Sequence, residues 1–225
     1  EAGYIFQEER ARQELERVLV VCPASLRTNW CREFDRFSPH PWRKVPVFSG
    51  QSVKHDLQQD ERTLVVVSYD LAAQPWLSSV SWDVLILDEA HYLKTRTTKR
   101  TKAIYGHGKR PGLISQAKRV WRLSGTPAPN YANELWTQFK SMGLLEQGET
   151  YYDFEGRYCK TYQAPFGTVI TGHRNTAELK QRLHGVFLRR KKDDVLKDLP
   201  PIYWHQVTVD KHDLDLPKDL VREAL

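Results

Sequence analysis

Two adjacent carboxylates, Asp88 and Glu89, directly follow the apolar run Val84–Leu87, and His91 comes shortly after them. Mg²⁺ prefers hard oxygen ligands and keeps several waters, so one carboxylate at the end of a strand is enough to hold it. A second carboxylate beside it can orient and deprotonate an attacking water. The pattern predicts that Asp88 binds Mg²⁺ through water and that Glu89 acts on the water. A plain acidic turn after a strand is the alternative.

A second cluster, Ser124-Gly125-Thr126-Pro127, follows another apolar run, Val120–Leu123. Serine, glycine, threonine and proline all favour turns, so this tetrapeptide alone is weak evidence for a site. Its position after a strand, downstream of the acidic pair, makes it a candidate partner for that pair.

These side chains need a framework that brings them together, and the apolar runs supply one. The runs are continuous and rich in β-branched residues, which is typical of parallel strands covered on both faces. The predicted strands are Val18–Cys22, Leu64–Ser68, Val84–Leu87, Val120–Leu123 and a weaker Val45–Phe48. Helix-compatible stretches alternate with them at Ser25–Phe37, Val53–Gln59 and Thr95–Tyr105. The alternation predicts an α/β fold with a parallel sheet flanked by helices.

Each predicted strand runs into polar or turn-forming residues. Pro23 and Ser25 follow the first run, Tyr69 follows Ser68, and the two clusters above follow the others. Ligands of open parallel sheets bind beyond the carboxyl ends of the strands. All four clusters are therefore expected at one edge of the sheet.

The composition of the 225-residue chain is that of a globular protein, with 40% hydrophobic and 28% charged residues. No stretch approaches the length of a membrane span, and the N-terminus has no apolar signal core, which favours a cytoplasmic protein without membrane contact. Cys22, Cys31 and Cys159 form no Cys-x-x-Cys pair, so neither a disulfide framework nor a zinc site is expected, and Cys22 reads as a small core residue.

The basic residues are unevenly distributed. Between Tyr92 and Asn133 the chain has no acidic residue, and the net charge of the whole chain is +6. A one-sign block of this kind is a candidate footprint for phosphates, or else a solvated face. Its members are Lys94, Arg96, Lys99, Arg100, Lys102, Lys109, Arg110, Lys118, Arg119 and Arg122.

Taken together, these segments resemble the first motor lobe of Swi/Snf-type ATPases in helicase superfamily two. The resemblance is carried in chain order by Val20–Leu26 with Asn29-Trp30, Val67–Asp70, Leu87–Lys94, Leu123–Pro127 with Asn130, Glu134–Trp136, and Phe187–Arg190 with Asp194–Leu196 and Leu199-Pro200. The Asp-Glu-Ala-His segment is similar to the family's DEAH-type magnesium motif. Thr95 departs from the asparagine that many members have there, a detail that does not threaten the assignment.

The resemblance implies a RecA-like lobe that uses ATP and Mg²⁺, tracks double-stranded DNA and works with a second RecA-like lobe. It implies that Ser124 and Thr126 bond toward His91 and couple hydrolysis to the grip on DNA. The residues that it implies in DNA contact are Pro23, Ser25, Ser68, Tyr69, Lys94, Arg189 and Arg190. A solvated charged helix is an alternative for the last two.

The same resemblance implies three regions. Residues 1–142 would form the RecA-like lobe, 143–201 a mainly helical protrusion, and 202–225 a linker toward the second lobe. Within the protrusion, Gly167–Gly172 reads as a hairpin or strand, and a helix is expected with Thr176 as its cap before Leu179, Leu183 and Val186.

The sequence contains no Gly-x-x-x-x-Gly-Lys-Ser/Thr phosphate loop. We therefore expect this sequence to be a piece of a larger protein, with Gly-Lys-Thr encoded just upstream of Glu1. A helix is expected over about Ala2 to Arg17. The piece alone is expected to be inactive. Two alternatives stay open: a degenerate lobe that binds DNA or protein, and a helicase subunit of a restriction or defence system. A bacterial or phage origin is expected over a nuclear one.

Overall fold

The computed structural model describes residues 16–38, 41–50, 53, 57, 62–165 and 167–190. The chain divides into two compact units, residues 1–182 and 183–225, and each is described by itself. Most of the helix expected over about Ala2 to Arg17, the linker 202–225 and most of Val53–Gln59 lie outside the described residues. The expected end of that helix is wrong, because Arg17 is already in a strand.

A five-stranded parallel sheet forms the centre of the first unit, in the order β2-β3-β1-β4-β5. Every predicted strand is present, so the α/β prediction is confirmed. The strands are β1 (Arg17–Cys22), β2 (Arg43–Pro46), β3 (Thr63–Ser68), β4 (Trp82–Leu87) and β5 (Ala117–Arg122). Leu123, which we expected to end the last strand, follows β5 and still donates its N–H to the Leu87 carbonyl at 2.9 Å.

The inner strands β1, β3 and β4 are almost entirely apolar because both of their faces are covered. Alternate residues point to opposite faces. In β1, Leu19 and Val21 join one core cluster, while Val18, Val20 and Cys22 join the other. Burial raises the pKa of the Cys22 thiol to about 12, with Asp88 adding to the shift, so Cys22 is the neutral core residue expected from the sequence.

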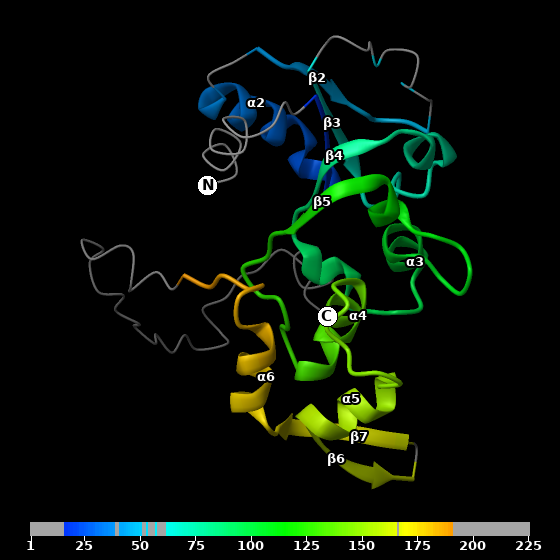
Figure 1. The fold of residues 1–225 in the computed structure, drawn as a ribbon, viewed down its shortest axis with the longest axis vertical. Helices are drawn as coiled ribbons and strands as arrows, with labels where there is room; N and C mark the ends of the chain where they lie inside the picture. Colours follow the sequence, from blue (N-terminus) through cyan, green and yellow to red (C-terminus); the bar gives the residue numbers. More distant parts are fainter. Residues whose placement is uncertain are drawn as a thin grey trace, which may run out of the picture. The chain divides into compact units, whose positions relative to one another are not determined.

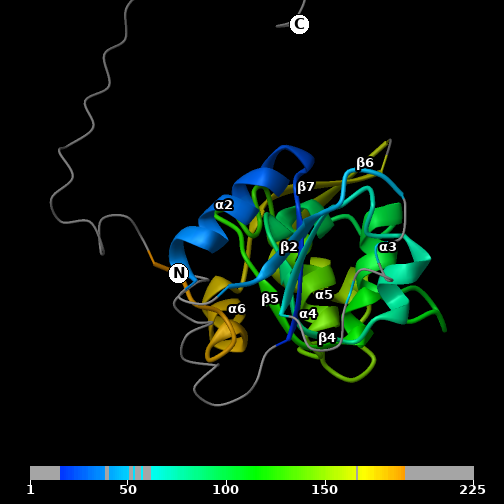
Figure 2. The same cartoon turned by 90° about the horizontal axis from the view of Figure 1, so that it is seen from above.

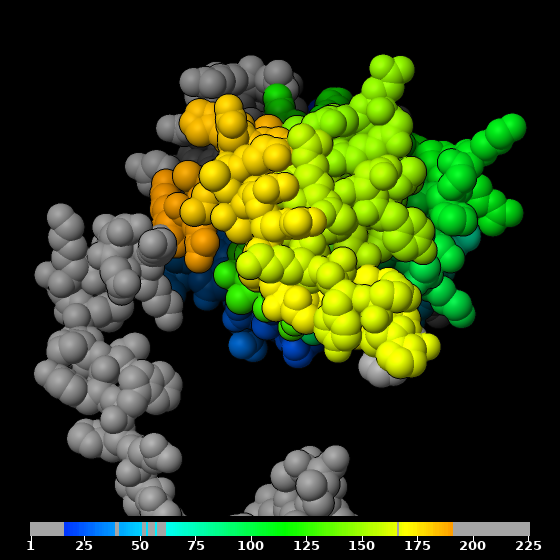
Figure 3. All heavy atoms as spheres, turned by 90° about the horizontal axis from the view of Figure 1, so that it is seen from below, coloured from blue at the N-terminus to red at the C-terminus, as the bar shows by residue number. Residues whose placement is uncertain are grey.

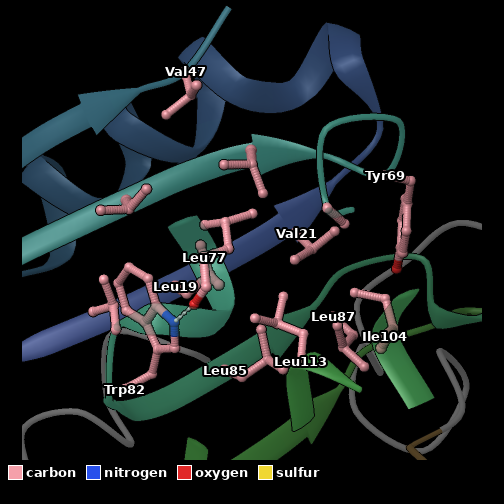
Figure 4. Close-up of a cluster of buried hydrophobic side chains, with 14 of the residues drawn as sticks. Leu19, Val21, Val47, Tyr69, Leu77, Trp82, Leu85, Leu87, Ile104 and Leu113 are labelled. Atoms are coloured by element: carbon pink, nitrogen blue, oxygen red, sulfur yellow. Dashed lines mark hydrogen bonds between the residues drawn. The ribbon is translucent and has the colours of Figure 1, made fainter. Parts of the chain in front are cut away.

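Helices lie on both sides of this sheet (Figures 1 and 2). On one side α2 (Arg27–Phe37) buries Phe34 against the even-numbered residues of β1. On the other, α3 (Lys99–Tyr105) contributes Ile104 to the larger cluster, together with Trp82 and Leu77. Figure 4 shows this cluster, including the Trp82 indole N–H that donates to the Leu77 carbonyl at 3.0 Å.

Short 3-10 helices connect several of these elements. They span Ala24–Leu26, Pro75–Ser79, Ala90–Leu93, Leu113–Gln116 and Ala132–Leu135. Two of them directly follow the strands β1 and β4 at the edge where the predicted site lies.

The chain then leaves the sheet through α4 (Trp136–Ser141) and α5 (Tyr151–Tyr158). A capping box between Thr150 and Asp153 starts α5, since each residue bonds the other's backbone N–H. The predicted hairpin follows as β6 (Cys159–Ala164) and β7 (Gly167–His173), which are antiparallel, and α6 (Thr176–Leu183) comes next. Viewed from below, these yellow-green to yellow elements form most of the coloured surface (Figure 3).

Two details of α6 differ from the prediction. Thr176 is already its first helical residue, and the preceding Asn175 accepts the first helical bond, from the Leu179 N–H at 3.1 Å. Asn175 has a φ of 50°, a conformation that asparagine tolerates better than most residues. Val186, which we expected on the helix, lies beyond its end at Leu183.

Candidate active site

The predicted site residues share one edge because all five strands run in the same direction. Cys22 pairs with Ser68, Val21 with Leu87, and Leu87 with Arg122. The residues that follow β1, β3, β4 and β5 therefore emerge together at the carboxyl edge, as expected.

Asp88 is held at four of its atoms. Its N–H donates to the Val21 carbonyl at 2.8 Å, and its own carbonyl accepts from the Tyr69 hydroxyl at 2.7 Å. The carboxylate accepts from the Trp30 indole N–H on Oδ2 at 2.7 Å and from the Glu89 N–H on Oδ1 at 3.0 Å. The orientation of this carboxylate is thus fixed before any ion binds.

Glu89 has a left-handed backbone, with φ 51° and ψ 51°. This conformation turns the chain sharply, so that the next N–H, of Ala90, donates to the Leu123 carbonyl at 2.8 Å. The Glu89 carboxylate stays partly exposed, at 39% of the side chain, and lies 3.1 Å from Nδ1 of His91. It is accessible to water while Asp88 is tied into the sheet edge.

His91 joins the two polar clusters. Its Nδ1 lies 3.2 Å from the Ser124 hydroxyl, as the family resemblance implied, and 3.1 Å from Glu89 Oε2. Nδ1 of His91 thus faces an oxygen from each of the two clusters. Thr126 is exposed, and its contact with this cluster is through its backbone N–H, which donates to Ser124 Oγ at 3.2 Å.

Buried polar side chains of helix α4 hydrogen-bond the turn Asp88–Leu93, and sequence reasoning missed them. The Gln138 amide donates to the Ala90 carbonyl at 3.1 Å, and the Thr137 hydroxyl donates to the Leu93 carbonyl at 2.8 Å. The Tyr105 hydroxyl in turn donates to Gln138 Oε1 at 2.6 Å, which fixes the amide orientation. The available signal was weak: Thr137 and Gln138 stand between Trp136 and Phe139, and buried polar groups are normally hydrogen-bonded.

Lys94 is engaged within the protein. Its ammonium lies 2.8 Å from Glu134 Oε1, and Asn130 donates to the same carboxylate from its side chain at 2.8 Å and its backbone at 3.0 Å. Burial opposes ionisation of Glu134, but these hydrogen bonds outweigh it and hold its pKa below the usual value. The predicted contact of Lys94 with DNA stays a prediction, and this ion pair is its structural role.

The donor set fits a magnesium ion. Asp88 and Glu89 offer hard oxygen atoms, and among the described residues no group of three or more His, Cys, Asp or Glu could form a closed metal site. Mg²⁺ is typically held by one or two carboxylates together with waters and substrate phosphates. The carboxylate part of such a site is therefore present at this edge.

Of the four motif residues implied in DNA contact, two are accessible and two are not. Ser25 is exposed and Pro23 half-buried on the loop and 3-10 helix after β1. Ser68 and Tyr69 are only 4% exposed. Burial raises the pKa of Tyr69, which stays a neutral donor to Asp88. Both side chains are therefore largely covered in this structure, and their contact with DNA phosphates stays a prediction.

The basic block is divided among several roles. Lys118 pairs with Asp83 at 2.7 Å, and Arg96 and Arg100 lie over the rings of Tyr151 and Tyr92 at 4.7 and 5.4 Å. Lys109 is exposed in a tight turn where His107 and Arg110 form a bridge. The block is therefore not one uniform phosphate-facing surface. Arg189 and Arg190 are exposed in the second unit, while Lys191 and Lys192 lie outside the described residues.

Comparison with known proteins decides the family of this chain. The model of the SNF2-related domain matches residues 2–215, nearly the whole sequence. The chain belongs to the SNF2-related family. Among solved structures, the SWI2/SNF2 ATPase core of Sulfolobus solfataricus in complex with dsDNA matches 68% of this SNF2-related chain with a TM-score of 0.51 and 26% identity, and 30% of that chain is covered.

Relatives of known function share about a third of their residues or fewer with this chain over the matched region. A SWI/SNF-related matrix-associated actin-dependent regulator of chromatin subfamily A-like protein 1 from Xenopus tropicalis is 34% identical over 81% of this chain. The DNA annealing helicase and endonuclease ZRANB3 from Mus musculus is 29% identical over 98%. The SNF2-related chain spans only 19% and 20% of these two proteins. Both relatives are from animals and give no support to a bacterial or phage origin.

No helix in the described part of the SNF2-related chain is long and apolar enough to cross a membrane.

Proposed function

We propose that this chain is the first motor lobe of an ATP-driven translocase on double-stranded DNA. The observation that carries the proposal is the continuous polar path at the sheet edge, from the Asp88 carboxylate through Glu89 and His91 to Ser124. Membership of the SNF2-related family and the fold of a DNA-bound ATPase core support it. An alternative role as a degenerate binding module would not require both carboxylates.

Each residue of the path has a role in this proposal. When bound, ATP would supply the phosphoanhydride bond that is hydrolysed, and Mg²⁺ would neutralise charge on its phosphates. Asp88 holds the ion through water, because its carboxylate is fixed by two donors. Glu89 orients the attacking water and takes its proton, since its carboxylate is partly exposed next to that fixed group. His91 contacts both Glu89 and Ser124, so a change in the Glu89 carboxylate can shift Ser124. Ser124 in turn accepts the backbone N–H of Thr126.

The DNA contacts follow from accessibility. Ser25 and Pro23 are exposed or half-exposed at the same edge and can donate to or pack against phosphates without reading sequence. Arg189 and Arg190 would add charge. The domain plan proposed with this function is a RecA-like lobe over 1–142, a protrusion over 143–201 and a linker over 202–225 toward a second lobe. A cytoplasmic location remains a prediction.

The decisive experiment measures ATP hydrolysis by the full-length protein that contains this chain, without DNA, with single-stranded DNA and with duplex. A translocase should be stimulated most by duplex, and should displace the third strand of a triplex in an ATP-dependent manner. Hydrolysis that ignores duplex would contradict the proposal. Duplex binding without any stimulated hydrolysis would instead favour the degenerate binding module.

A salt titration of duplex binding tests the phosphate contacts separately. If several phosphates are neutralised, the logarithm of the affinity should fall linearly and steeply with the logarithm of salt concentration. Two unrelated duplex sequences serve as the control and should give the same affinity. A flat salt response would rule out phosphate tracking.

A further inference from the structure

The indole of Trp30 reaches the predicted magnesium ligand from the helix that begins beside a predicted DNA contact. Its Nε1 lies 2.7 Å from Asp88 Oδ2, across 58 residues of sequence. Trp30 is on α2, and α2 follows the 3-10 helix that carries Ser25 without a break. One side chain thus connects the two parts of the proposed site.

Trp30 constrains the orientation of the Asp88 carboxylate from outside the turn that carries Asp88. The bond on Oδ1 comes from the neighbouring Glu89 N–H, so it moves with the turn itself. Among the described residues, the Trp30 indole is the only donor to this carboxylate that comes from another element. An indole N–H can only donate, and a bond to an ionised carboxylate is about twice as strong as a neutral one. Trp30 therefore selects the carboxylate rotamer.

Hydrogen bonds hold the segment between Ser25 and Trp30 together. The Leu26 N–H donates to the Pro23 carbonyl at 2.9 Å, and the Arg27 guanidinium bonds the carbonyls of Ala24 at 3.0 Å and Val47 at 2.8 Å. Trp30 itself packs against the core cluster that includes Phe34. A displacement of the Ser25 turn by DNA would be carried to the indole, because no flexible joint separates them.

We propose that Trp30 is a positioning residue that couples duplex binding at the Pro23–Ser25 turn to the orientation of Asp88, and thereby to magnesium-dependent nucleotide binding. This inference rests on the proposed function. It assigns no chemical step to Trp30, which acts through the carboxylate.

The test compares wild-type full-length protein with Trp30→Phe, which keeps an aromatic ring and removes the N–H. Calorimetry with a non-hydrolysable ATP analogue is run with and without Mg²⁺, and with and without a short duplex. The variant should lose about tenfold of the Mg²⁺-dependent affinity, the usual size for the loss of a group that orients a metal ligand. Its affinity without Mg²⁺ should be unchanged, and the effect of duplex on Mg²⁺-dependent binding should shrink.

Two controls separate positioning from packing. Trp42→Phe removes an indole from the same cluster, where Trp42 lies edge-on to Phe34 at 5.3 Å, and should leave Mg²⁺-dependent binding at the wild-type level. In an Asp88→Asn background, Trp30→Phe should cause no further loss. Trp30→Leu, which also lacks the N–H, should repeat the Trp30→Phe result, and thermal unfolding checks that each variant is folded.

The inference is overturned if Trp30→Phe keeps the wild-type magnesium dependence, if Trp42→Phe loses as much, or if the loss persists in the Asp88→Asn background. In all three cases the wild-type protein still binds nucleotide with Mg²⁺, so the proposed function stands. A wild-type protein with no Mg²⁺-dependent nucleotide binding would overturn the proposed function and this inference together.

Discussion

The turns that follow β4 and β5 lie side by side at the same sheet edge, yet they are held in opposite ways. The turn after β4, Asp88–Leu93, is bonded by side chains from three other elements: Trp30 of α2, Tyr69 after β3, and Gln138 with Thr137 of α4. In the turn after β5, Gly125 and Thr126 are exposed, and the Thr126 N–H donates to Ser124, two residues away.

The difference follows from what each turn would do in the proposed motor. Groups that position an ion and a water must keep their geometry, and such groups are usually held by a supporting shell of hydrogen bonds. A segment that senses the state of hydrolysis must be able to move. The two turns are joined through the His91–Ser124 contact and the Lys94–Glu134 ion pair, so these links are where the comparison can be tested.

The largest effect is expected at the rigid turn from Glu89→Gln. Glutamine keeps the size but cannot take a proton, so hydrolysis should fall by about 10²- to 10⁴-fold while nucleotide binding persists. Asp88→Asn should instead weaken Mg²⁺-dependent binding. Glu33→Gln, on the exposed side of α2, is the matched control and should hydrolyse normally. Hydrolysis at the wild-type rate by Glu89→Gln would refute the assigned role.

The support beneath the rigid turn should affect stability next most strongly. Gln138→Leu leaves the Ala90 carbonyl and the Tyr105 hydroxyl without their partner, which should cost about 1–3 kcal/mol of unfolding free energy. Urea denaturation measures it, with exposed Gln181→Leu on α6 as the control. Equal midpoints for the two variants would show that the buried bonds do not stabilise the turn.

Ser124→Ala probes the exposed turn after β5 and should give a smaller, functional effect. Loss of the hydroxyl removes one hydrogen bond to His91, so the duplex-stimulated rate should fall about three- to tenfold. The unfolding free energy should change by about 1 kcal/mol or less, because Ser124 is only half-buried and its hydrogen-bond partners can turn to water. A stability loss as large as that of Gln138→Leu would contradict the contrast between the turns.

The smallest expected effect is on the pH dependence of folding stability below neutral pH. Because hydrogen bonds from Lys94 and Asn130 outweigh burial and lower the pKa of Glu134, its ion pair stabilises the fold above the ordinary pKa of 4.5. That stability is lost as the pH falls through the lowered value. Urea midpoints from pH 7 down to about pH 3 should show Glu134→Gln less acid-sensitive, by about 1 kcal/mol or less. An identical pH profile would exclude this contribution.

The sheet could be predicted from the sequence because it depends on side-chain patterns along single strands. The continuous runs at Val18–Cys22 and Leu64–Ser68 require cover on both faces, which places them inside a parallel sheet. The edge on which Asp88 and Ser124 meet then follows from strand direction alone. The His91–Ser124 contact was implied by the family resemblance and is present at 3.2 Å.

What the sequence did not reveal are contacts between elements. Tyr69 was expected at the DNA surface, but nothing along the chain shows that its ring turns inward to stack on Tyr92 at 5.5 Å. Trp30 was noticed as part of a motif without a role, since its partner is 58 residues away. Gln138 and Glu134 were missed as supports of the turn because their carbonyl and ammonium partners exist only in the folded chain.

The left-handed backbone of Glu89 has a consequence for how this protein can change. A non-glycine residue in this region typically costs about 1–2 kcal/mol, which glycine would not incur. Laboratory evolution that rewards only thermal resistance should therefore enrich glycine or asparagine at position 89 and discard the proposed base. Selection for turnover should restore glutamate. Position 89 is thus a place where durability and catalysis favour different amino acids.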